Sequence, residues 1–158
     1  MKGKCLLFCS LWIMLLCVQA NLSGGGFGDQ YAWVRWSEAK IVASQQDKPI
    51  MVILHKTWCG ACKRLKPLVA GSKAMLDLSD KFVMVNAEDD EEPSSDPDFS
   101  IDGGYIPRIV FLDSSGNIRP EFSNTRRGDK YKYFYPSSDE IIISMNNVLA
   151  NIATKQEL

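Results

Sequence analysis

Two cysteines separated by two residues are the side chains of this sequence most able to do chemistry. Cys59 and Cys62 stand in the stretch HKTWCGACKRLKP, residues 55–67, with Gly60 and Ala61 between them. Pairs with this spacing occur in redox couples, in metal sites and in structural disulfides. The three kinds of site need different surroundings, and the rest of the sequence shows which of them is present.

A redox couple needs one cysteine held as a thiolate and a second one placed to displace it. Cys59 follows an apolar run typical of a strand and begins a helical pattern, so unpaired N–H groups and the helix dipole would stabilise its anion. Four basic side chains add positive charge nearby: Lys56, Lys63, Arg64 and Lys66. Cys62, one helical turn later, could attack a mixed disulfide at Cys59 and release a client. Gly60 leaves room for that client, and Trp58 offers it a flat apolar surface.

The two other kinds of site fit less well. Structural zinc takes four ligands, usually from two cysteine pairs, whereas this chain has one close pair and one histidine, His55. A zinc site would need a second chain or carboxylates, so we expect no metal. A structural disulfide between Cys59 and Cys62 would close a very small loop and constrain the unfolded chain little. We expect His55 to be a packed strand residue and not a catalytic base.

The start of the chain has the pattern of a signal peptide. Lys2 and Lys4 give a basic start, residues 5–18 are apolar except for one serine, and a small residue, Ala20, follows. The apolar run is shorter than the ~20 residues that span a bilayer, so we expect cleavage of residues 1–20 and no membrane attachment afterwards. Three of the five cysteines lie in this segment: Cys5, Cys9 and Cys17. The mature chain therefore keeps one pair.

The end of the chain points to a compartment. Lys155–Leu158, KQEL, differs from the KDEL retrieval signal at one position. Together with a signal peptide it predicts retention in the endoplasmic-reticulum lumen through a retrieval receptor, with secretion as the alternative. Cleavage would reduce Lys+Arg from 18 to 16 against 19 acids, a formal charge near −3. No strong basic patch suggests a nucleic-acid partner.

Hydrophobic spacing outlines the elements between these ends. Helical spacing is present in three groups of residues: Ala32, Trp36, Ala39 and Ala43; Leu65, Leu68, Val69, Ser72 and Leu76, with Pro67 as a kink; and Ile141, Met145, Val148 and Ile152 after the capping-box sequence at 137–140. Apolar runs predict strands at 50–54, 82–85 and 109–112, the last doubling back through a turn at 114–117. A weaker strand pattern covers 131–135.

This order predicts one α/β domain, residues 27–153, with a mixed central sheet and helices on both faces. The glycine-rich leader before it, residues 21–26, is expected to be flexible. A long loop covers residues 87–104 and begins with five acids, Glu88–Glu92. We expect these acids to be a solvated loop and not a calcium site, because EF-hand spacing is absent.

Several stretches resemble the thioredoxin superfamily. The sequence WCGAC follows an apolar strand, Pro67 stands eight residues after Cys59, and Tyr105-Ile106-Pro107 precedes a strand. Longer stretches are similar to the small single-domain endoplasmic-reticulum thioredoxins, which are related to the anterior gradient proteins. They are GFGD (26–29), HKTWCGACK (55–63), FVMVN (82–86), DGGYIPRIVFLD (102–113) and YKYFY (131–135). Unlike the anterior gradient proteins, which lack a full pair, this chain keeps both cysteines.

The resemblance implies a thioredoxin-like fold and protein thiol–disulfide exchange. Cys59 would be the nucleophile and Cys62 the resolving thiol of a redox-active disulfide. Pro107 would be cis, and the Ile106 backbone would pair with an extended client segment. The client-binding residues would be Trp58, Gly60, Ala61, Ile106 and Pro107. The expected partners of a monomer are cysteine-containing clients and glutathione as redox co-substrate, without a bound cofactor; the alternative is a non-catalytic module that anchors partners through mixed disulfides.

Two positions depart from the superfamily. Thioredoxins carry a buried acid six residues before the first cysteine, where this chain has Ile53, so another proton route is needed. Disulfide isomerases carry a histidine between the cysteines, where this chain has Ala61. Reduction potential follows the relative stability of thiolate and disulfide, so both departures leave the direction of exchange open.

Overall fold

The centre of the fold is β1 (Ile50–His55), every residue of which is buried. The computed structural model describes residues 22–156. In them β1 lies between β2 (Val83–Glu88), which is parallel to it, and β3 (Arg108–Leu112), which is antiparallel. Ile53 stands opposite Asn86 on one side and Ile109 on the other. A strand covered on both faces and paired on both edges requires the continuous apolar run that the sequence has. The predicted mixed sheet is confirmed.

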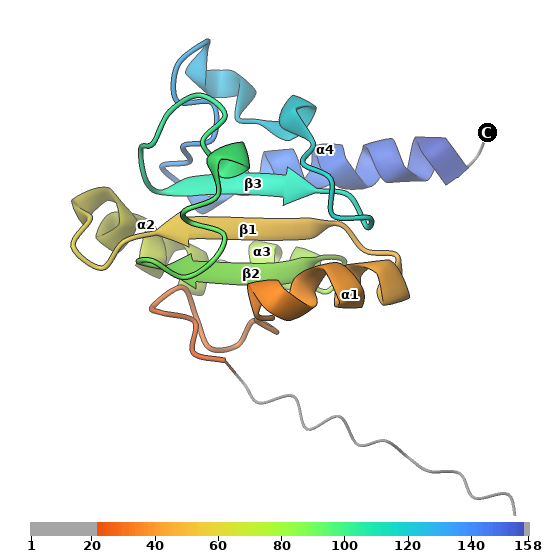
Figure 1. Ribbon diagram of the computed structural model, residues 1–158, viewed down its shortest axis with the longest axis horizontal. Helices are drawn as coiled ribbons and strands as arrows, with labels where there is room; N and C mark the ends of the chain where they lie inside the picture. Colours follow the sequence, from red (N-terminus) through yellow and green to blue (C-terminus); the bar gives the residue numbers. More distant parts are fainter. Residues whose placement is uncertain (1–21, 157–158) are drawn as a thin grey trace, which may run out of the picture.

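Helices cover both faces of this sheet, as expected (Figure 1). One face carries α2 (Gly60–Ala70), α3 (Lys73–Ser79) and α4 (Ser138–Gln156), packed on alternate β1 residues such as Met51 and Ile53. The other face carries α1 (Trp36–Gln46) and a 3-10 turn at Pro97–Phe99. Two further 3-10 turns, Pro120–Phe122 and Thr125–Arg127, connect β3 to α4. This is the mixed sheet with helices on both faces that the order of elements predicted.

The predicted helix after the cysteine pair is wrong in one respect, because it divides into two. α2 contains Pro67 and ends where the Gly71 N–H donates to the Pro67 carbonyl at 3.0 Å. Ser72 then caps α3, its hydroxyl accepting the Met75 N–H at 3.3 Å. Helical spacing continues across the break, but a glycine followed by a serine favours a stop and a new cap over one helix.

The weak strand pattern at 131–135 does not form a strand. Tyr131 has a left-handed backbone, with φ at 59°, and accepts the Phe134 N–H at 3.0 Å in a turn. Tyr133 and Tyr135 are buried, so core packing explains the alternation. The turn at 114–117 does form, with the Asp113 N–H donating to the Asn117 carbonyl at 2.9 Å, but its return strand is reduced to a single bridge between Leu112 and Ile118.

The glycine-rich leader contacts the domain where the structure describes it. The Phe27 N–H donates to the Gly24 carbonyl at 2.7 Å, and the Trp33 indole N–H donates to the Gly28 carbonyl at 2.7 Å. Phe27 is fully buried, so this turn is tied to the core. We call residues 24–28 the N-terminal strap.

Both terminal signals lie largely outside the described residues. The predicted signal peptide at 1–20 and the last two residues of the KQEL sequence are not described, and Lys155 and Gln156 end α4. Among residues 22–156, no helix has the length and apolar character needed to cross a membrane.

Two leucines of α2 test the packing of this helix. Leu65 is 1% exposed against the sheet and Leu68 is 45% exposed. We expect Leu65→Ala to lower the free energy of unfolding by about 2–5 kcal/mol, because it leaves a cavity between α2 and the sheet. Leu68→Ala makes the same chemical change on the solvent side and should cost less than about 0.5 kcal/mol. Urea denaturation followed by circular dichroism measures both, and equal losses would contradict this packing.

Candidate redox site

Cys59 is the residue with which α2 begins. β1 ends at His55 and α2 starts at Gly60, so Cys59 occupies the N-cap position with an extended backbone (φ −75°, ψ 118°). Its sulfur accepts the Cys62 backbone N–H at 3.2 Å. A sulfur here faces the unpaired N–H groups and the positive end of the helix dipole, both of which favour a thiolate. The predicted position of Cys59 at a helix start is confirmed.

The loop before β3 reaches the same sulfur from the other side. The Ile106–Pro107 peptide bond is cis, and the Cys59 thiol lies 3.7 Å from the Ile106 carbonyl oxygen, to which it donates. Pro107 is buried and Ile106 is half-buried. The structure therefore brings together residues 47 positions apart. This is the neighbourhood that the resemblance implied for Ile106 and Pro107.

The two thiols differ sharply in environment. Both are free, but Cys59 is 6% exposed whereas Cys62 is fully buried. Burial, and next the neighbouring Cys59 sulfur, raise the pKa of Cys62 to about 12. Cys62 is therefore a protonated thiol at neutral pH and is hidden from bulky reagents. This difference suits a couple in which one sulfur meets partners and the other acts only from inside.

The surface around Cys59 is open and partly apolar. Trp58 is 73% exposed, and Ala61 is half-buried. A Cβ added to Gly60 would meet only the Arg64 guanidinium, at 3.6 Å. All three expected client-binding residues of the turn therefore lie beside the reactive sulfur, with space above Gly60.

The acidic loop after β2 holds the cysteine turn in place. Asp89 accepts the Thr57 backbone N–H at 2.8 Å and also the Thr57 hydroxyl, and Lys56 pairs with Asp90 at 2.8 Å. The Thr57 backbone hydrogen bond is the main cause that holds the pKa of Asp89 below its usual range. Glu88 is the last residue of β2 and not part of the loop, whereas Asp90, Glu91 and Glu92 are exposed as expected of a solvated loop.

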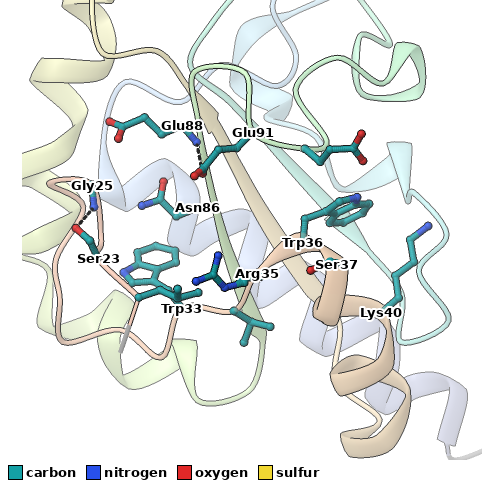
Figure 2. A pocket seen from close by; sticks show the side chains of 13 residues that line it. Ser23, Gly25, Trp33, Arg35, Trp36, Ser37, Lys40, Asn86, Glu88 and Glu91 are labelled. Carbon is teal, nitrogen blue, oxygen red and sulfur yellow. Dashed lines mark hydrogen bonds between the residues drawn. The ribbon is translucent and has the colours of Figure 1, made fainter. Parts of the chain in front are cut away.

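A partly buried polar cluster, which the sequence did not predict, lies behind the turn. The ring of His55 contacts Asn86 through Nε2, at 2.5 Å from Oδ1. Glu88 Oε1 lies 3.7 Å from His55 Nδ1 and 3.2 Å from the Lys66 ammonium. Two of the four cations expected to support Cys59, Lys56 and Lys66, are thus paired with acids. The one available signal was Asn86 (Figure 2), a polar residue between the apolar residues Val85 and Ala87 of β2.

Metal ligands are not assembled near the pair. Among residues 22–156, no three His, Cys, Asp or Glu side chains are grouped so that they could hold a metal ion.

Comparison with known proteins identifies the family. A thioredoxin-like family model matches residues 32–114, which include both cysteines and Pro107. The chain belongs to the thioredoxin-like family. This thioredoxin-like protein is also distantly related to the anterior gradient proteins. It is 34% identical to the anterior gradient protein 2 homolog of Mus musculus over 134 residues, 84% of this chain and 74% of that protein. It is 32% identical to anterior gradient protein 3 of Homo sapiens over 138 residues, 78% of this chain and 81% of that protein.

The unequal burial of the two thiols in this thioredoxin-like domain predicts selective alkylation. At neutral pH we expect iodoacetamide to modify Cys59 in native Cys62→Ser at least about tenfold faster than it modifies Cys62 in native Cys59→Ser, because Cys62 is fully buried and its raised pKa keeps it protonated. Mass spectrometry of the intact variants measures the rates. Both should react alike in denaturant, which is the control. Equal rates in the native variants would contradict the burial of Cys62.

Proposed function

We propose that this protein is a thiol–disulfide oxidoreductase that exchanges disulfides with cysteine-containing client proteins. The observation that carries the proposal is the position of Cys59: its sulfur caps α2, faces the Ile106 carbonyl at 3.7 Å and has Cys62 buried one helical turn behind it. Nucleophile, client-pairing backbone and resolving thiol thus meet at one point. A cysteine pair within a thioredoxin-like fold supports thiol–disulfide chemistry.

In the reducing direction, exchange takes two steps. The Cys59 thiolate attacks a client disulfide, so that a Cys59–client disulfide forms and the client's other sulfur leaves with the electron pair. Cys62 then loses its proton and attacks Cys59, which forms the Cys59–Cys62 disulfide and releases the second client sulfur. Two electrons pass to the client, and the oxidising direction is the reverse. Client segments pair with the Ile106 backbone as an added strand, beside Trp58, Gly60, Ala61 and Pro107.

Glutathione is the proposed redox co-substrate. As a small thiol it would reach Cys59 over the open face above Gly60 and reduce the Cys59–Cys62 disulfide, forming oxidised glutathione after two such exchanges. The direction in cells depends on the potential of the pair relative to glutathione. Neither Ile53 nor Ala61 has an ionisable side chain, so other groups must set the potential of the pair.

Single serine substitutions test the proposal. We expect Cys59→Ser to abolish insulin reduction with reduced glutathione as electron donor, because no nucleophile remains at the surface. Cys62→Ser should keep the first step and lose the second, so that mixed disulfides with clients accumulate and can be isolated on non-reducing gels. The matched control is Ser72→Ala, which alters a cap of α3 away from the pair. A wild-type protein that traps clients but never turns over would support the alternative, a non-catalytic client-anchoring module. A wild-type protein that shows neither turnover nor trapping would contradict both the oxidoreductase and the client-anchoring module.

We also propose residence in the endoplasmic-reticulum lumen, supported by the basic and apolar start of the chain and by its KQEL end. Deleting Lys155–Leu158 from the full-length chain should move the protein from cells into the culture medium, because the retrieval receptor has nothing to bind. Immunoblots of cells and medium measure this. A variant ending in KDEL is the control and should stay inside. If the deletion variant stays inside as well, the tetrapeptide does not retain the protein.

A further inference from the structure

The loop before β3 carries the Ile106 carbonyl on a glycine-rich stretch. Gly103 and Gly104 are both exposed, and Gly103 has a positive φ of 132°. A Cβ added to Gly104 would meet nothing within 4 Å, so none of the described residues packs closely against the chain there. Glycine allows a backbone more freedom than any other residue. The position of Ile106 must therefore be fixed by contacts of the residues on either side of it.

On the side of β3, the sheet fixes the chain. Pro107 is buried, and Arg108, which is 3% exposed, pairs with Leu54 of β1. The Arg108 guanidinium also donates through Nη1 to the Gly103 carbonyl. The residues that follow Ile106 are thus held by the core.

On the other side, Tyr105 is held by its hydroxyl. The hydroxyl donates to the Asp102 carboxylate, whose two oxygens lie 2.6 and 2.7 Å away. It also accepts the Tyr133 backbone N–H at 2.9 Å. A hydroxyl has one proton and two lone pairs, so it can make both kinds of bond at once. One oxygen atom therefore connects the residue before Ile106 to Asp102 and to the turn at 131–135.

Asp102 makes a second contact with the same turn. Its Oδ2 atom accepts the Lys132 backbone N–H at 2.7 Å, and hydrogen bonds to a carboxylate are stronger than those between neutral groups. The turn is itself fixed to β3, because the Ile109 N–H donates to the Tyr133 carbonyl at 2.9 Å. We call the side chains of Asp102 and Tyr105, with the N–H groups of Lys132 and Tyr133, the tyrosine clamp.

Packing and charge keep the Tyr105 hydroxyl in this state. The half-buried Tyr105 ring meets the Tyr131 ring edge to face, with ring centres 4.9 Å apart, and the Arg108 guanidinium lies 5.9 Å from the ring centre. Burial, and next the hydrogen bond to Asp102, raise the pKa of Tyr105 above its ordinary value. The hydroxyl therefore keeps its proton at neutral pH and continues to donate to Asp102.

We propose that Tyr105 and Asp102 are positioning residues for client binding, an inference that rests on the proposed thiol–disulfide exchange. They hold the residue before Ile106, so that the Ile106 carbonyl stays 3.7 Å from the Cys59 sulfur. An extended client segment then finds the backbone with which it pairs already in place. Such preorganisation raises affinity, because the loop loses little freedom when the client binds. A disulfide without a peptide backbone gains nothing from it.

Two probes with the same leaving group separate client pairing from the chemistry of Cys59. Each is a mixed disulfide with a coloured aromatic thiol, one on a single blocked cysteine and the other on a cysteine in the middle of a short extended peptide. The aromatic thiol has the lower pKa and leaves, so its colour reports attack by Cys59. Stopped-flow mixing with the whole reduced protein gives both second-order rate constants. Their ratio, peptide over single cysteine, measures pairing with the Ile106 backbone.

We expect the wild-type ratio to be about tenfold or more, since pairing adds backbone hydrogen bonds. Tyr105→Phe keeps the ring and removes the hydroxyl, and Asp102→Ala removes the acceptor, so the ratio should fall to near one in both. The rate with the single cysteine should stay within about twofold of wild type, because the start of α2 and not the clamp stabilises the Cys59 thiolate. Tyr131→Phe is the matched control. It removes the same group from the neighbouring ring, which is 55% exposed, and should keep the wild-type ratio.

Three results would overturn the inference. A wild-type ratio near one leaves no backbone pairing to be positioned. A wild-type ratio in a clamp variant shows that the clamp does not set it, and either variant decides this if the other does not fold by circular dichroism. An equal fall of both rate constants in a folded variant shows that the clamp supports Cys59 itself. A wild-type protein that reacts with neither probe would overturn the proposed function instead.

Discussion

The hydrogen bond from the Cys62 N–H to the Cys59 sulfur is the contact on which the site depends. It exists because β1 ends at His55 and α2 begins at Gly60, so that the turn between them presents a cysteine where a helix needs a cap. The reactive group and the cap are therefore the same atom. The contacts that fix the end of β1 and the first turn of α2 therefore also keep the Cys59 sulfur at the positive end of the helix dipole.

Three separate segments meet at that turn and fix its shape. Asp89 of the acidic loop accepts a hydrogen bond from Thr57. The loop before β3 brings the Ile106 carbonyl to the Cys59 sulfur. Phe27 of the N-terminal strap packs against His55, the last residue of β1. Cys62 is fully buried within α2, whereas Cys59 at the start of the helix keeps some exposed surface. Enclosure disfavours the thiolate, so the pKa of the Cys62 thiol lies above its ordinary value.

The sequence predicted the elements that obey one strong local rule. β1 is a continuous apolar run, α1 and α4 carry apolar residues at helical spacing, and the Ser137 hydroxyl accepts the Glu140 N–H at 3.4 Å as the capping-box sequence predicted. Where a hydrophobic pattern competed with core packing or with a helix stop, the prediction from the pattern was wrong. Residues 131–135 alternate like a strand, but their tyrosines fill gaps in the core from a turn. The spacing after the pair suited one long helix, but Gly71 and Ser72 stopped it.

The sequence alone determined the pair itself, its place between a buried strand and a helix, and the residue types around it, because these depend on neighbours along the chain. Tertiary structure alone decided the unequal burial of Cys59 and Cys62 and the polar contacts of His55. The contacts of His55 come from Asn86, Glu88 and the strap, which lie about thirty residues away on either side and reach the ring only when β2 and the N-terminal turn pack. Burial and hydrogen-bond partners are properties of the packed chain, and no local spacing encodes them.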